Sequence, residues 1–204
     1  MSAMLGPIHH WIYRKIEAQE MLNRQIVTVA KENGWEEQAL DKPLESFYRE
    51  ELPPLEEVID LSNIHAWLSS SISDIETRYA ELVTGLLVNH PERLKTMEEI
   101  CFRFGQEYAI PAGATIEEAF QEIQSLFLDG MPCDRAIRIM ENNGSVISFQ
   151  RVLDLHTEYW RAVQGDSENY YALRKRIVEG MLSESGYRLN TVGDGIYELY
   201  FSVA

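Results

Sequence analysis

The sequence predicts an all-α protein, a multi-helix bundle that ends in a small C-terminal β-hairpin. Apolar residues recur at intervals of three and four along most of the chain, which is the spacing of one helix face. Asp194-Gly195, between two runs rich in aromatic and aliphatic residues, is typical of a hairpin turn. With 204 residues, 45% hydrophobic and 25% charged, the chain has the size and composition of a single helical domain over residues 1–204.

The first helix is expected to begin at Pro7, because the N–H that proline lacks would be unpaired in the first helical turn anyway. Apolar residues from Ile8 to Val29 then follow at helical spacing. Asn33-Gly34 predicts the end of this helix, since glycine readily takes the left-handed conformation of a helix cap.

Residues 35–60 predict an acidic, irregular connector. Pro53-Pro54 breaks any helix that begins there. Trp35, Phe47 and Tyr48 are large apolar side chains that need cover, so we expect the connector to pack on the bundle and not to mark a domain boundary.

The clearest helix pattern runs from Ser62 or Asn63 to Asn89, and Pro91 ends it. Its apolar residues step by alternating threes and fours: Leu61, Ile64, Leu68, Ile72, Ile75, Tyr79, Leu82 and Leu86. Such a seam is typical of helices that pack side by side in a bundle.

Five further helices are expected in the rest of the chain. Their ranges are 92–109, 115–129, 132–142, 151–163 and 167–184. Thr115 and Glu118 have the spacing of a capping box at the start of the second. Asn142-Asn143-Gly144 predicts the end of the third, and Ser145–Phe149 is expected to be extended.

The hairpin is expected over residues 187–203. Tyr197, Leu199, Phe201 and Val203 alternate along its second strand and would face one side. A two-stranded hairpin alone is marginal in water. It must therefore pack on the helices or pair with a partner chain.

The net charge of −15, from 33 acidic and 18 basic residues, excludes several classes of partner. Such a surface repels the phosphates of nucleic acids and of anionic membranes, so we expect neither as a partner. No apolar run approaches the ~20 residues that a membrane span needs. Because the N-terminal residues lack the pattern of a signal peptide and the two cysteines form no framework, we expect a cytoplasmic protein.

The histidines are the best candidates for chemistry, because the common motifs of zinc proteases, nucleotide-binding proteins and hydrolases are absent. His156 falls in the middle of the apolar face expected for the helix at 151–163, with Tyr159 and Trp160 close to it. A buried imidazole needs a hydrogen-bond partner or a metal. It is therefore either a satisfied core residue or part of a site.

Two of the predicted helices repeat one arrangement of histidine and glutamate. His9 and Glu20 are eleven residues apart, as are His65 and Glu76, so each pair shares a helix face. Tyr13 lies on the same edge as His9. If the two helices pack antiparallel, His9 comes level with Glu76 and His65 with Glu20.

These positions suggest a small-molecule-binding protein or enzyme with a histidine- and glutamate-lined site. Imidazole and carboxylate suit a divalent ion such as iron, zinc or manganese, and helical bundles hold such ions between facing helices. The candidate metal ligands are His9, His65, His156, Glu20 and Glu76, and the sequence leaves open whether His10 replaces His9. The candidate lining of a pocket for an organic ligand is Tyr13, Tyr159 and Trp160.

The alternative is a non-catalytic interaction or regulatory protein in which the histidines are structural. Long apolar seams and an exposed hairpin would then form the interface of a homodimer, because unpaired strand edges invite partners. Neither the reaction nor the ligand follows from the residues alone.

Overall fold

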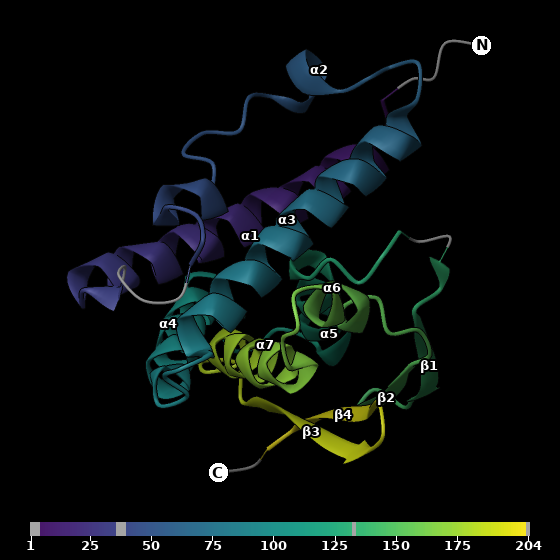
Figure 1. The fold of residues 1–204 in the computed structure, drawn as a ribbon. Helices are drawn as coiled ribbons and strands as arrows, with labels where there is room; N and C mark the ends of the chain where they lie inside the picture. Colours follow the sequence, from purple (N-terminus) through teal and green to yellow (C-terminus); the bar gives the residue numbers. More distant parts are fainter. Residues whose placement is uncertain (1–4, 36–39, 132–133, 203–204) are drawn as a thin grey trace. The chain divides into compact units, whose positions relative to one another are not determined.

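The computed structural model describes residues 5–35, 40–131 and 134–202, and it shows an α+β protein (Figure 1). Of the described residues, 56% are helical, and they include a four-stranded antiparallel sheet. The prediction of an all-α fold is therefore wrong, whereas the predicted C-terminal hairpin is confirmed.

The chain folds into two compact units, each of which is described by itself. Unit 1 comprises Met1–Leu94 and His156–Ser167, and unit 2 comprises Lys95–Leu155 and Glu168–Ala204. That the whole chain acts as a single domain stays a prediction.

Unit 1 is built on two long helices, α1 (Pro7–Glu32) and α3 (Ile64–Leu87). Both agree with the predicted ranges, and the side chain of Asn63 caps α3 by accepting a hydrogen bond from the N–H of Ala66. Most of each apolar seam is buried as expected, with Ile26, Ile75 and Leu82 fully inaccessible to solvent. Ile8 and Leu61, at the N-terminal ends of the seams, are 39% and 51% exposed. Three short helices complete the unit: η2 (Leu44–Phe47), α2 (Leu55–Val58) and α6 (Thr157–Ala162).

The connector between α1 and α3 runs back along α1 from its end to its beginning (Figure 1). Four contacts, taken in the order of the connector, reach successively earlier residues of α1: Phe47 with Asn23, Arg49 with Glu20, Pro53 with Tyr13, and Glu56 with His10. Because the chain returns to the start of α1 before α3 begins, the two long helices run parallel.

Unit 2 contains the sheet and three helices, α4 (Arg93–Glu107), α5 (Ile116–Leu126) and α7 (Ser167–Met181). The first residues of α4 and α7 belong to unit 1. The strands are β1 (Ile137–Asn142), β2 (Val146–Arg151), β3 (Tyr187–Gly193) and β4 (Ile196–Phe201), in the order β1-β2-β4-β3. The capping box of Thr115 and Glu118 is present as predicted.

Two of the expected helices differ in the structure, because residues expected to be helical form strands or the segments next to them. Residues 137–142 form β1 in place of the second half of a helix over 132–142, whose residues 132–133 lie outside the described part. Asn143-Gly144 belongs to the turn from β1 into β2, with Gly144 at φ 77°. The helix expected over 151–163 shortens to α6, because β2 extends to Arg151.

The covered face of the sheet carries its apolar residues. Phe120 of α5 packs edge-on against Phe149 of β2 with ring centroids 5.0 Å apart, and Phe149 stacks on Tyr197 of β4 at 5.4 Å. Ser148 and Gln150 alternate with Phe149 and so lie on the opposite, polar face. The residue types alternate with a period of two, although Ile147, Ser148 and Phe149 are all buried.

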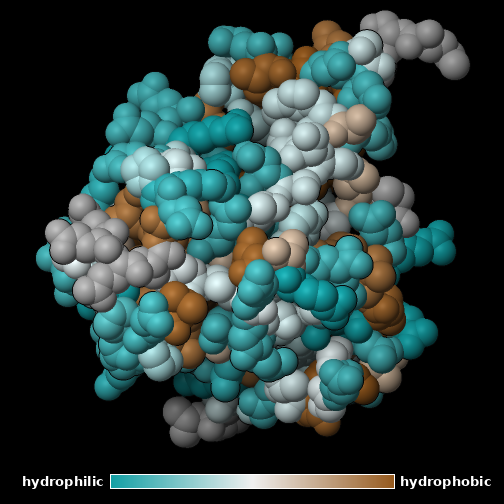
Figure 2. Space-filling model, viewed as in Figure 1, coloured by the Kyte–Doolittle hydropathy of each residue, from teal (hydrophilic) through white to brown (hydrophobic). Residues whose placement is uncertain are grey.

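Hydrophilic residues dominate the face of the molecule shown in Figure 2, and the hydrophobic residues visible there form small separate areas. Such a surface agrees with the net charge of −15. None of the helices in the described ranges has the length and apolarity that crossing a membrane requires.

Helices α4 and α7 cross at two glycines in unit 2. A methyl group on Gly105 would lie 2.0 Å from the carbonyl oxygen of Ile177, and one on Gly180 would lie 2.1 Å from that of Phe102. These are backbone atoms of the opposing helix, which cannot rotate away. The two backbones therefore touch, and only glycine fits at either position.

We predict that Gly180→Ala lowers the free energy of unfolding by a net ~1–2 kcal/mol, because overpacking costs about 1–3 kcal/mol and this contact is with a backbone atom. This cost outweighs the gain of about 1 kcal/mol that alanine has over glycine inside a helix. Urea unfolding followed by circular dichroism measures the change. Lys175→Ala, at an exposed position of the same helix, is the control and should change stability by less than about 0.5 kcal/mol. Equal stability of Gly180→Ala and the wild type would contradict the close crossing.

Candidate functional site

The predicted ligands His9 and His65 meet at the first turns of α1 and α3. Their ring centroids are 5.9 Å apart in an edge-to-face arrangement. The Nδ1 atom of His9 accepts a hydrogen bond of 2.9 Å from the backbone N–H of Gly6. An imidazole that accepts at Nδ1 carries its proton on Nε2, which is then a donor and not a metal ligand. His9 thus caps the start of its own helix.

Tyr13 lies one turn further along α1 and holds the connector. Its hydroxyl donates a hydrogen bond of 2.8 Å to the carbonyl oxygen of Pro53, and its ring lies 6.1 Å from that of Trp67. Burial, together with the nearby Glu17 carboxylate, raises the pKa of Tyr13. The predicted pocket residue is a packing and hydrogen-bonding residue of unit 1.

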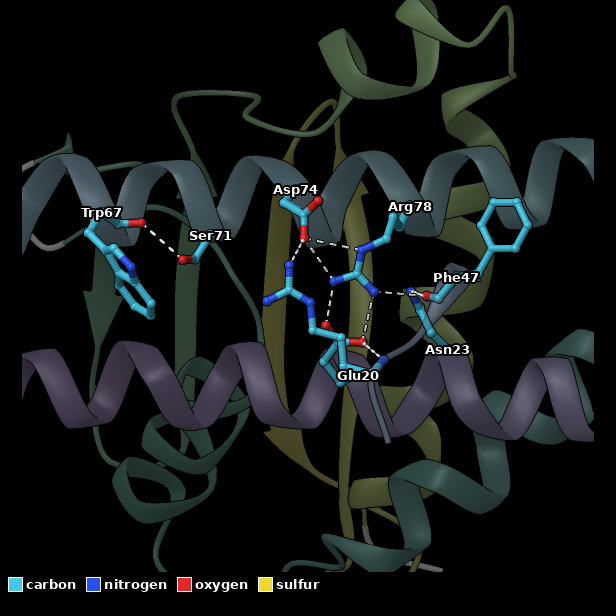
Figure 3. Close-up of polar contacts among 8 residues, drawn as sticks. Glu20, Asn23, Phe47, Trp67, Ser71, Asp74 and Arg78 are labelled. Carbon is cyan, nitrogen blue, oxygen red and sulfur yellow. Dashed lines mark hydrogen bonds and ion pairs between the residues drawn. The ribbon is translucent and has the colours of Figure 1, made fainter. Parts of the chain in front are cut away.

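Glu20 is the centre of an ion-pair network between the two long helices (Figure 3). Its carboxylate is only 4% exposed, and both of its oxygens accept hydrogen bonds from the guanidinium of Arg78. One of them also accepts the backbone N–H of Arg49 at 2.9 Å. Arg78 is held in turn by Asp74 at 3.0 Å and by the carbonyl oxygen of Phe47 at 3.1 Å. Because Arg78 and the backbone of Arg49 donate hydrogen bonds to its oxygens, the Glu20 carboxylate has a structural role in joining the two helices.

Glu76 and His156 form a second buried pair. The Nδ1 atom of His156 lies 3.1 Å from a carboxylate oxygen of Glu76, and the side chains are 2% and 1% exposed. The expectation that His156 is buried is confirmed, but its place on the apolar face of a helix is corrected, because it is the N-cap residue of α6. The pair ties α6 to α3, and both side chains are almost completely inaccessible to solvent.

The aromatic residues expected beside His156 surround this pair. Trp160 is fully buried and packs edge-to-face on Tyr79, with ring centroids 5.9 Å apart. Burial raises the pKa of the half-buried Tyr159, and a contact with Ser73 opposes that shift. These side chains fill the core around α6.

The five predicted metal ligands therefore lie at three places in unit 1. His9 lies next to His65 at the start of the helices, Glu20 next to Arg78, and Glu76 next to His156. In the described part of the chain, no group of three or more histidine, cysteine or acidic side chains could hold a metal ion. The parallel course of α1 and α3 accounts for this, since antiparallel packing was needed to bring His9 level with Glu76.

A pocket lies in unit 2, and none of the candidate site residues predicted from the sequence lines it. It has a volume of about 490 Å³ and is open to solvent. Its lining comes from β1, the end of β2 and the turn between β3 and β4: Arg138, Gln150, Arg151, Val152, Asp154, Asp194 and Gly195. The sequence predicts the turn at Asp194-Gly195. It does not predict the pocket, because the other lining residues fall mostly in the helices expected over 132–142 and 151–163.

The charged groups of this pocket are positioned by the sheet. The backbone N–H of Arg151 donates to the carbonyl oxygen of Gly195 at 2.8 Å, which fixes the end of β2 against the turn. Its guanidinium lies 3.9 Å from the ring centre of Tyr171. Arg138 donates to the side-chain oxygen of Gln150 at 2.6 Å. Burial, with the nearby Asp154 carboxylate, raises the pKa of Tyr171.

Comparison with known proteins found no matching family model, no matching curated protein and no matching solved structure.

We predict that His156→Ala lowers the free energy of unfolding by about 3–5 kcal/mol, because it leaves the Glu76 carboxylate buried beside a cavity. The double variant Glu76→Leu/His156→Leu should lose less than the sum of the two single leucine variants, since it leaves no unpaired charge. Chemical denaturation of the wild type, the two single leucine variants and the double variant measures this coupling energy.

His10→Ala is the matched control, because the contact of His10 with Glu56 is largely exposed and such pairs contribute about 0–1 kcal/mol. Additive losses in the double variant would show that Glu76 and His156 are independent, contrary to the pairing.

Proposed function

We propose that the chain is a small-molecule-binding protein and that its ligand, which carries a carboxylate, binds in the pocket of unit 2. The observation that carries the proposal is the guanidinium of Arg151. It is half-buried at the edge of this pocket, and no carboxylate of the described residues forms an ion pair with it.

The state of Arg151 differs from that of the other buried arginines. Arg78 is paired with Glu20 and Asp74, and Arg174 makes two hydrogen bonds of 2.6 Å to Asp129. In a chain with 33 acidic residues, carboxylates are abundant, yet Arg151 faces a ring and a pocket. A planar guanidinium held on an aromatic ring is preorganised for bidentate binding of a carboxylate.

The remaining lining restricts the class of ligand. The lining sets the carboxylates of Asp154 and Asp194 against the guanidinium groups of Arg138 and Arg151, so its formal charge is zero. It therefore favours a ligand with charges of both signs over a polyanion such as a nucleotide. The same carboxylates attract an ammonium group or accept hydrogen bonds from hydroxyl groups. A molecule with one carboxylate and one amino group, such as an amino acid, matches both sides. The volume of about 490 Å³ lies within the range of small-molecule sites.

We predict that a free amino acid raises the melting temperature of the wild-type protein, whereas the corresponding amino-acid amide, which lacks the carboxylate, does not. A ligand at a hundred times its Kd stabilises a protein by about 2.7 kcal/mol. Differential scanning calorimetry with the standard amino acids, one at a time, provides the measurement, and titration calorimetry gives the affinity.

Arg151→Met removes the charge but keeps a long apolar side chain against Tyr171, so it should abolish the shift and leave the fold intact. Arg161→Met removes an exposed arginine in unit 1 and should bind as the wild type does. Binding that survives Arg151→Met, or the absence of a shift with every amino acid, would refute the proposal.

A further inference from the structure

We infer that β1 is the contact surface for a second copy of this chain, which adds its own β1 antiparallel to the first across a twofold axis. β1 is an edge strand, because the sheet has the order β1-β2-β4-β3 and no described strand pairs with the outer side of β1. Edge strands present unpaired N–H and C=O groups to which another strand can bond.

Exposed apolar residues gather at this edge. Ile139 and Met140 of β1 are 52% and 54% exposed, and Val152 and Leu153, which follow β2, are 46% and 44% exposed. The backbone N–H groups of Val152 and Leu153 both donate to the carbonyl oxygen of Ala136, directly before β1. Four of the ten large exposed hydrophobic residues of the described chain thus lie on or beside one strand, which is typical of an interaction surface.

A β-bulge places the two charges of β1 on the same face. Arg138 lies opposite Gln150 and Glu141 lies opposite Ser148, while the register shifts between Ile139 and Glu141. Ser148 and Gln150 are two residues apart on β2 and so share its polar face. Arg138 and Glu141 therefore share that face too, although three residues separate them.

This arrangement makes the strand complementary to itself. In an antiparallel pair centred between Ile139 and Met140, Arg138 of one copy lies opposite Glu141 of the other, and the twofold axis repeats the pair. Ile139 of one copy then lies opposite Met140 of the other. Opposite charges and apolar residues in register are the cross-strand contacts that stabilise a sheet. Charge complementarity thus favours a second copy over an unrelated acidic protein.

The other edge strand lacks these features. β3 carries Arg188 but no carboxylate, and of its residues only Val192 is a large exposed hydrophobic. Two copies of β3 would therefore bring no opposite charges together. The surface for self-association is β1, and not the C-terminal hairpin expected from the sequence.

Sedimentation velocity over a range of protein concentrations tests the inference with two charge variants. Glu141→Arg gives a strand with two positive charges, and Arg138→Glu gives one with two negative charges. Each variant alone should dimerise about tenfold more weakly than the wild type, because two attractive cross-strand pairs become repulsive. An equimolar mixture of the two variants should recover the dimer, since each strand then faces its complement.

Circular dichroism and thermal unfolding establish that both variants fold, and Arg188→Glu on β3 is the control that should dimerise as the wild type does. A wild type that stays monomeric at every concentration overturns the inference. So does a dimer that Glu141→Arg leaves unchanged, and so does a mixture of the variants that fails to associate. Arg151→Met, which changes the ligand pocket alone, should leave the dimer intact.

Discussion

The pairing of buried carboxylates is the constraint on which both units depend. The chain has 33 acidic residues and 18 basic ones, so most of its carboxylates must stay in water. An acidic group that is buried without a partner costs several kcal/mol. The carboxylates buried deepest each have a specific partner: Glu20 with Arg78, Glu76 with His156, and Asp129 with Arg174. Each pair joins segments that are distant in sequence, which fixes α1 on α3, α6 on α3, and the segment after α5 on α7.

The direction of the long helices follows from one of these pairs and from the connector that surrounds it. The helix ends at Gly34 and Asn63 were predictable because they rest on local capping chemistry. The eleven-residue spacing of histidine and glutamate fits parallel and antiparallel packing equally well. What decides is the path of residues 40–60, which bonds to α1 through backbone groups of Phe47, Arg49 and Pro53. Every residue offers such groups, so no sequence pattern reveals them.

The hairpin formed by β1 and β2 was not predictable from local sequence patterns either. Asn143-Gly144 is compatible both with the end of a helix and with a turn between strands, and the short runs beside it hold too few residues for either period to dominate. The hairpin at Asp194-Gly195 was predictable because Asp-Gly is a specific turn signal and Tyr197, Leu199 and Phe201 alternate directly after it. Missing β1 and β2 also meant missing the pocket, since its arginines lie on those two strands. Glu20, Glu76 and His156 are buried, whereas His65 is exposed. The residues that pair with the buried groups are distant in the sequence, so no local pattern identifies them.

Arg151 and Arg174 show how a guanidinium that the fold satisfies differs from one that faces a pocket. Both cations lie on an aromatic ring in unit 2, 3.9 Å from Tyr171 and 4.0 Å from Phe127. Arg174 also has the carboxylate of Asp129, so its charge is satisfied within the fold. Arg151 has the same kind of aromatic support and an open pocket where Arg174 has a carboxylate. Arg174 has both the carboxylate of Asp129 and the hydroxyl of Tyr170 as partners, whereas the proposed ligand would supply the carboxylate for Arg151.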